Sequence, residues 1–99
     1  MRIKKGVDVF GLKPEMVIVS LVVNDVCHMH GVECCLTSVR DGSPKRSPKS
    51  LHRFGFASDY SIQGVKNKPV FAEDIRSRLP DDYDVVLESD HVHVEYDPK

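Results

Sequence analysis

The sequence lacks a long hydrophobic run. Its longest apolar stretch, Met16 to Val26, contains three polar residues and is too short to cross a bilayer. The charged residues at the N-terminus are not followed directly by the apolar core of a signal peptide. We therefore expect a protein that does not insert into a membrane and that is cytoplasmic or released by cell lysis.

The sequence also lacks an excess of charge of either sign. Lys and Arg number 14 and Asp and Glu 15, which gives no general electrostatic reason to bind nucleic acid or a membrane surface. Basic residues do gather between Lys45 and Arg53. A nucleic-acid adaptor that uses this segment is one alternative, but a solvated loop is the simpler interpretation. The 99 residues suffice for one domain, so we expect a single unit over residues 1–99.

Cysteine is too scarce for a disulfide framework. The three cysteines, Cys27, Cys34 and Cys35, are odd in number and two of them are adjacent, which favours reduced and buried thiols. A zinc site that combines them with His28 and His30 is an alternative. Its spacing, C-H-x-H-x3-C-C, does not match the common zinc fingers, so the simpler interpretation is preferred.

The order of apolar, polar and turn residues predicts two helices and several strands. Lys13-Pro14-Glu15 is typical of a helix start, and this helix is expected to run to His30 and stop at Gly31. A second helix is expected over 70–79, and strands over 7–10, 32–39, 55–62, 83–88 and 91–96. The pattern predicts an α+β domain in which two helices pack against a small, mainly antiparallel sheet.

Two blocks of the sequence concentrate side chains that bind zinc. Residues 50–59 follow the pattern S-x-H-x-x-G-x-A-x-D, and residues 90–93 read D-H-x-H. Imidazole nitrogen and carboxylate oxygen are the ligands that catalytic zinc prefers. A set of two histidines and one carboxylate leaves the fourth tetrahedral position open for water, so the blocks predict a catalytic zinc site on the sheet.

Strand alternation makes this site geometrically possible. Ala57 and Asp59 fall on one face of their strand, and in the last strand both histidines and Glu95 fall together on one face. His52 lies seven residues before Asp59, which in an unbroken strand would put it on the opposite face. A bend or bulge near Gly55 is therefore required if both residues are to bind one ion.

Taken together, the two blocks resemble the zinc-dependent peptidases of the D-Ala-D-Ala carboxypeptidase family. This family includes cell-wall carboxypeptidases, dipeptidases and phage endolysins, and the resemblance extends from Thr37 to Tyr96. It implies an enzyme that holds one zinc ion per chain and hydrolyses peptide bonds of peptidoglycan stem peptides with metal-activated water. A small chain of this kind is expected to be a phage-type or lysis-associated hydrolase.

The resemblance implies roles for the residues of both blocks. His52, Asp59 and His93 correspond to the zinc ligands, and Asp90 corresponds to the general base that takes a proton from water and returns it to the leaving amine. Glu88 is a rival base, because some family members use a glutamate three residues before a histidine.

Four further residues are expected around the metal. Arg40 follows Thr37-Ser38-Val39 and resembles the family arginine that binds substrate and stabilises the developing oxyanion. Ser38, Ser50 and His91 are expected to support the ligands or contact the substrate. The alternative function is a catalytically inactive, zinc-containing module that binds a peptide or a protein in the same groove.

Overall fold

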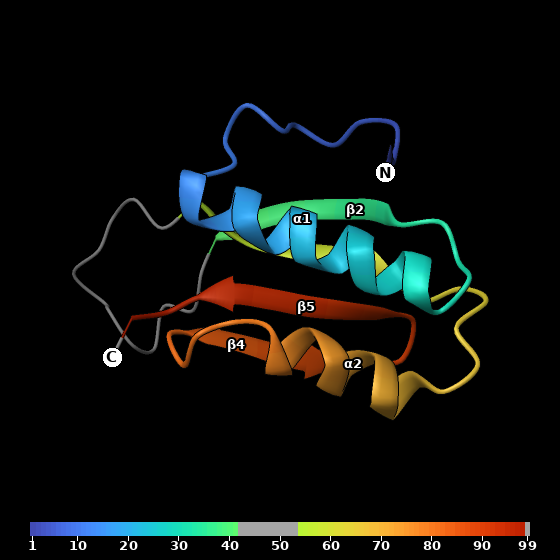
Figure 1. The fold of residues 1–99 in the computed structure, drawn as a ribbon. Helices are drawn as coiled ribbons and strands as arrows, with labels where there is room; N and C mark the ends of the chain where they lie inside the picture. The colour runs from blue at the N-terminus through green and yellow to red at the C-terminus, as the bar shows by residue number, and fades with distance from the viewer. Residues whose placement is uncertain (42–53, 99) are drawn as a thin grey trace.

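The computed structural model describes residues 1–41 and 54–98. These residues form a five-stranded sheet with two helices on one of its faces (Figure 1). The strand order is β1-β2-β3-β5-β4; β1 pairs with β2 in parallel and the other neighbours are antiparallel. The predicted α+β class is confirmed. The elements are β1 (Arg2–Ile3), α1 (Pro14–Met29), β2 (Cys35–Asp41), β3 (Phe54–Ser61), α2 (Lys68–Ser77), β4 (Tyr83–Leu87) and β5 (His91–Tyr96).

Helix α1 begins and ends where the sequence predicts. Pro14 occupies the first helical position, where its missing N–H costs no hydrogen bond, and Glu15 lies in the first turn near the positive end of the helix dipole. His30 is the C-terminal cap, and Gly31 follows with φ +73°, a left-handed conformation that glycine adopts without strain. In the described residues no helix is both long and apolar enough to cross a membrane.

The core lies between the helices and the sheet. The buried face of α1 includes Val19, Val23 and Val26, which share one cluster with Val92 and Val94 of β5. These five side chains are fully buried, and burying each contributes roughly 1.5–3 kcal/mol. A polar contact crosses the same layer, because the Tyr60 hydroxyl of β3 lies 2.9 Å from Ser20 Oγ of α1 and accepts a 3.1 Å hydrogen bond from Ser58 Oγ.

Helix α2 is fixed at both ends by side-chain hydrogen bonds. The Asn67 side chain caps its N-terminus by accepting from the Val70 N–H at 3.2 Å, as N-cap residues do. In its last turn Arg76 donates to the Val85 carbonyl of β4 at 2.8 Å. The guanidinium thus satisfies one acceptor of the edge strand β4, which limits the capacity of that edge to pair with another chain.

The expected strand over residues 7–10 is wrong. The first strand is instead β1, and the 7–10 segment belongs to the connection to α1. Within it the Phe10 N–H donates to Asp8 Oδ1 at 3.0 Å, a local side-chain hydrogen bond that competes with a strand ladder. The other expected elements are present with shifted ends, and β2 extends to Asp41, where a loop was expected to have begun.

Candidate functional site

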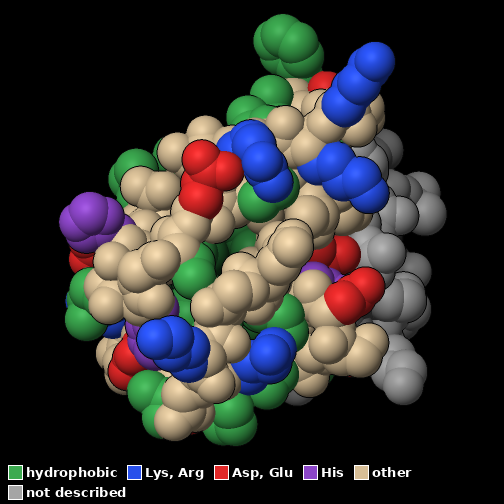
Figure 2. All heavy atoms as spheres, turned by 90° about the vertical axis from the view of Figure 1, so that its right-hand side faces the viewer, with side chains coloured by type: hydrophobic (Ala, Val, Ile, Leu, Met, Phe, Trp, Pro, Cys, Tyr) green, Lys and Arg blue, Asp and Glu red, His purple; other side chains and the backbone are tan. Residues whose placement is uncertain are grey.

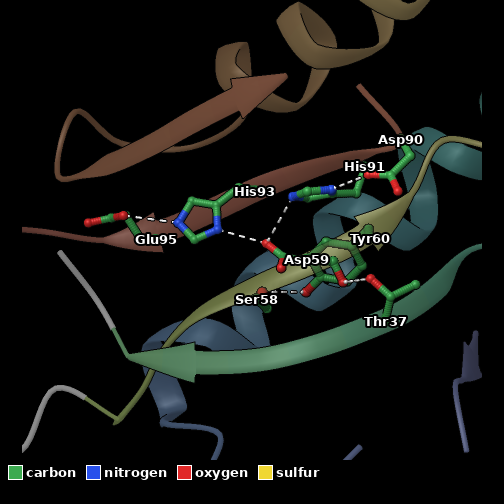
Figure 3. Close-up of polar contacts among 8 residues, drawn as sticks. All are labelled: Thr37, Ser58, Asp59, Tyr60, Asp90, His91, His93 and Glu95. Atoms are coloured by element: carbon green, nitrogen blue, oxygen red, sulfur yellow. Dashed lines mark hydrogen bonds and ion pairs between the residues drawn. The ribbon is translucent and has the colours of Figure 1, made fainter. Parts of the chain in front are cut away.

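The candidate site lies where β3 and β5 run side by side. In their antiparallel register Asp59 is directly opposite His93, Ser61 is opposite His91 and Ala57 is opposite Glu95. Val92 and Val94 belong to the core, so alternation turns both histidines and Glu95 to the sheet face away from the helices. The expected division of the two strands into faces is confirmed (Figure 3).

His93 is held between two carboxylates. Its Nδ1 lies 2.7 Å from Asp59 Oδ1 and its Nε2 lies 3.0 Å from Glu95 Oε1. Both ring nitrogens thus face carboxylate oxygens, an arrangement that favours the doubly protonated form of the ring. The hydrogen bond to Asp59 raises the pKa of His93 above its ordinary value; burial opposes this rise and Glu95 reinforces it.

His91 continues the same polar chain toward the β4–β5 turn. Its Nδ1 lies 2.7 Å from Asp90 Oδ1, and its Nε2 lies 3.8 Å from Asp59 Oδ1. The hydrogen bond with His91 lowers the pKa of Asp90, and the positive charge of Lys4 adds to the effect. Carboxylates and imidazoles therefore alternate from Asp90 through His91, Asp59 and His93 to Glu95 (Figure 3).

Strand β2 supports the backbone of Asp59 from the other side. Thr37 Oγ1 donates to the Asp59 carbonyl at 3.2 Å, and Ser38 is paired with Asp59 in the β2–β3 register. Asp59 is only 3% exposed, so its carboxylate has a fixed position. The backbone of Arg40 is paired with Ala57, while the Arg40 side chain, like Ser50 and His52, lies outside the described residues.

Gly55 produces the predicted bend near the start of β3. Its φ is +87°, and the β2–β3 register shifts beside it, between Arg40 and Asp41. A Cβ atom on Gly55 would lie 1.7 Å from the Gly11 carbonyl oxygen, so any side chain would collide with backbone. The Lys13 N–H also donates to the Gly55 carbonyl at 3.1 Å. The glycine of the first block is therefore required because two backbone segments meet there.

A hollow of about 390 Å³ opens beside this chain of polar groups. It is lined by residues of β2, β3 and β5, by the residue that follows β1 and by the β4–β5 turn, and so lies across several strands at one end of the sheet. Glu88, the rival base, is not among the lining residues, whereas Asp90 is. The lining comprises Lys4, Thr37, Asp59, Ser61, Asp90 and His91.

Asp59 and His93, two of the three expected zinc ligands, bring a carboxylate oxygen and an imidazole nitrogen together. Two ligands of one tetrahedral zinc, each about 2.05 Å from the metal, are about 3.4 Å apart. Asp59 Oδ1 and His93 Nδ1 are 2.7 Å apart. A zinc ion could replace the shared proton if these two side chains moved slightly apart. Glu95 would then accept from the remaining ring N–H, which is the arrangement that orients and strengthens metal-ligating histidines.

Two features of the site went unrecognised in the sequence. Glu95 was placed on the correct face, but its contact with His93 was not foreseen; the spacing of two residues within one strand is the signal that predicts it. Asp84, Glu95 and Asp97 also place carboxylate oxygens within 4.8 Å of one another. This second group has oxygen donors only, which suit calcium or magnesium better than zinc.

His30 and the three cysteines are separate from this site. His30 Nε2 lies 2.7 Å from Asp74 Oδ2 of α2, so it joins the two helices. Within the described residues the three cysteines are buried and free of disulfides, as predicted. No protein-family model, curated protein or solved structure matches the chain. The resemblance to the peptidases therefore stays a prediction based on the motif residues.

Proposed function

We propose that the chain is a zinc-dependent peptidase that hydrolyses peptide bonds of peptidoglycan stem peptides. The observation that carries the proposal is the contact of Asp59 with His93 Nδ1, completed by Glu95 on Nε2. A buried carboxylate, an imidazole and a carboxylate behind the imidazole form two ligands and an orienting residue of a zinc centre. In this proposal His52 supplies the third protein ligand, and the chain holds one ion.

Zinc, when bound, lowers the pKa of a water molecule and polarises the substrate carbonyl. The residues of the chain perform the remaining tasks. Asp90 holds the Nδ1 proton of His91, which in the neutral ring leaves Nε2 with a lone pair facing the Asp59 side of the hollow. The Asp90–His91 pair takes the proton of the attacking water and returns it to the leaving amine, so that the products are a carboxylate and an amine.

Arg40 is proposed to hold the developing oxyanion, and Ser38 and Ser50 to support the ligands. Arg40 belongs to β2, whose Thr37 already contacts the Asp59 backbone, so its strand neighbours the site. A fixed fork of donors suits an oxyanion better than a flexible ammonium does. We further propose that the enzyme acts after release by cell lysis, as expected of a phage-type hydrolase, and needs no nucleic acid.

A zinc-containing module that binds a peptide or protein without cleaving it is the second candidate. The observation that favours it is the lowered pKa of Asp90, because a carboxylate that binds protons weakly is a poor general base. Replacing Asp90 by Asn separates the two functions. A peptidase would lose about 100- to 10,000-fold in turnover while keeping its metal, whereas a binding module would keep both metal and ligand affinity.

The experiment that tests the zinc centre is elemental analysis of protein purified without an affinity tag. We expect about one zinc per chain in the wild type, and loss of zinc in His52→Ala and Asp59→Asn. His28→Ala is the matched control, since His28 is an exposed histidine outside the site. A wild type that is free of metal and takes up no added zinc would overturn the proposal. Zinc retained by Asp59→Asn would remove Asp59 from the ligand set.

A further inference from the structure

Lys4 reaches the hollow beside Asp59 from outside the two sequence blocks. It follows β1, whose pairing with β2 brings the start of the chain to this end of the sheet. The backbone of Lys4 is fixed there, because its N–H donates to the Leu36 carbonyl at 2.9 Å and its carbonyl accepts from the Val7 N–H at 3.1 Å. The resemblance to the peptidases begins only at Thr37, so it assigns no role to Lys4.

Lys4 is the one lysine or arginine among the residues that line this hollow in the described part of the chain. The other charged groups of the lining are the carboxylates of Asp59 and Asp90, with His91 beside them. Lys4 makes no ion pair with another described residue. Its charge nevertheless reaches the site, because after the hydrogen bond with His91 it is a further cause of the lowered pKa of Asp90. Figure 2 shows this end of the molecule, where acidic, basic and histidine side chains meet on a hollowed surface.

Hydrolysis of a peptide bond would add negative charge to this hollow. When the oxygen of water bonds to the carbonyl carbon, that carbon becomes tetrahedral and the electron pair of the C=O double bond moves to the carbonyl oxygen. The carboxylates of Asp59 and Asp90 repel this new charge. The hollow, about 390 Å³, is at the small end of the roughly 300–1,000 Å³ of ligand pockets, so a group bound beside Asp59 lies close to its other walls. A cation in the lining therefore attracts the tetrahedral anion more strongly than the neutral peptide.

We propose that the ammonium of Lys4 stabilises the negative charge that develops on the carbonyl oxygen of the cleaved bond. The inference rests on the proposed function and deepens it, because it adds a residue of the N-terminal segment to a site otherwise built from the motif residues. The role differs from that of Arg40, whose fork of donors would hydrogen-bond the oxygen. The ammonium of a lysine is a compact charge on a flexible stem, which suits electrostatic stabilisation without a fixed geometry.

The test compares the affinities of two probes for the zinc-loaded chain by isothermal titration calorimetry. The first probe is acetyl-D-alanyl-D-alanine, whose peptide bond is planar and neutral. The second is its phosphinate analogue, in which a tetrahedral, negatively charged phosphinate and a methylene group replace the peptide bond. Both probes carry the same terminal carboxylate, so the ratio of their affinities reports only the charge at the position of the cleaved bond. Every sample carries Asp90→Asn, which keeps the peptide intact.

We expect Lys4→Gln to weaken phosphinate binding about tenfold and to leave peptide binding unchanged; the loss is smaller than the roughly 100- to 1,000-fold effect of a buried oxyanion donor because Lys4 is exposed and water screens its charge. Lys4→Arg keeps the charge and should restore most of the affinity. Lys5→Gln is the matched control, since Lys5 is an exposed neighbour that does not line the hollow. Unchanged zinc content and free energy of unfolding in Lys4→Gln would exclude a merely structural effect.

The other outcomes separate the inference from the proposed function. Unchanged phosphinate binding in Lys4→Gln, an equal loss for both probes, or an equal loss in Lys5→Gln overturns the inference. A chain that binds neither probe overturns it as well. With Asp90 restored, cleavage of stem peptides at a rate that does not depend on Lys4 supports the peptidase and overturns the inference. A preference for the phosphinate that depends on Lys4, in a chain that cleaves no stem peptide, supports recognition of the charge by Lys4 and overturns the peptidase.

Discussion

Replacing Gly55 by Ala tests the link between the first motif and the fold. Two costs follow from the structure. Residue 55 has φ +87°, which costs a residue with a Cβ about 1–2 kcal/mol. The new Cβ would also lie 1.7 Å from the Gly11 carbonyl oxygen, so one backbone segment must move, and the hydrogen bond from Lys13 N–H to the Gly55 carbonyl is lost for about 1 kcal/mol more. We expect a total loss of about 3 kcal/mol, a large part of the roughly 5–15 kcal/mol that stabilises a domain.

The matched control is Gly31→Ala. Gly31 has φ +73°, but a Cβ at this position meets no atom within 4 Å, so this variant carries the conformational cost alone. Both free energies of unfolding are measured by urea denaturation with chelator present, which prevents bound metal from stabilising the folded state. The difference between the variants isolates the collision with Gly11. If Gly55→Ala destabilises the chain no more than Gly31→Ala does, the close approach of the two segments is refuted.

Three further changes probe the site and the packing around it. Glu95→Gln weakens the hydrogen-bond acceptor behind His93, so this variant should bind zinc about 10- to 100-fold more weakly in competition with a chelator. The control, Glu88→Gln, should leave the zinc affinity unchanged. Equal zinc affinities of the two variants would mean that Glu95 does not orient a ligand. Burial raises the pKa of Tyr60, so the unfolded chain releases its phenolic proton at lower pH than the folded chain, and stability should fall as the pH rises above about 10. Tyr60→Phe should flatten this alkaline decline in urea unfolding, and an unchanged slope would assign the decline to another group. Asn67→Ala removes the cap of α2 and should cost about 1 kcal/mol in thermal unfolding, against almost nothing for Asn24→Ala on the exposed side of α1.

The helices and the last two strands follow from local sequence. Pro14 and Gly31 mark the ends of α1 through backbone conformations that belong to single residues. In β5, the alternation of apolar and polar residues likewise determines locally which side chains face the core. Strand β1 was missed because it has only two residues and exists through pairing with Cys35 and Leu36, more than thirty positions away. No local pattern encodes such a pairing.

The candidate site also has some features that local sequence predicts and others that depend on residues far apart in the chain. The residue types of both blocks, and the faces taken by Asp59, His91 and His93, could be read from the sequence. The direct opposition of Asp59 and His93 could not, since it depends on the register between two strands that are separated by α2 and β4. The bond between Asp90 and His91 was also missed, because it depends on side-chain rotamers at the β4–β5 turn.

The energetics of the polar chain argue for a role other than stability. Asp59 is almost fully buried, and His93 is held between two carboxylates, the hydrogen bond to Asp59 raising its pKa, on a sheet of a 99-residue chain. Removing such charges from water costs several kcal/mol per ion, and apolar residues of similar volume often serve stability as well or better. Near this point the same two strands face the helices mainly with hydrophobic residues, among them Tyr60, Val92 and Val94, and Ser58 is a polar exception that donates a hydrogen bond to Tyr60. The destabilising charged groups are thus confined to one face of the sheet, the face where binding and proton transfer are proposed. Departures from the rules that favour stability are expected at functional sites.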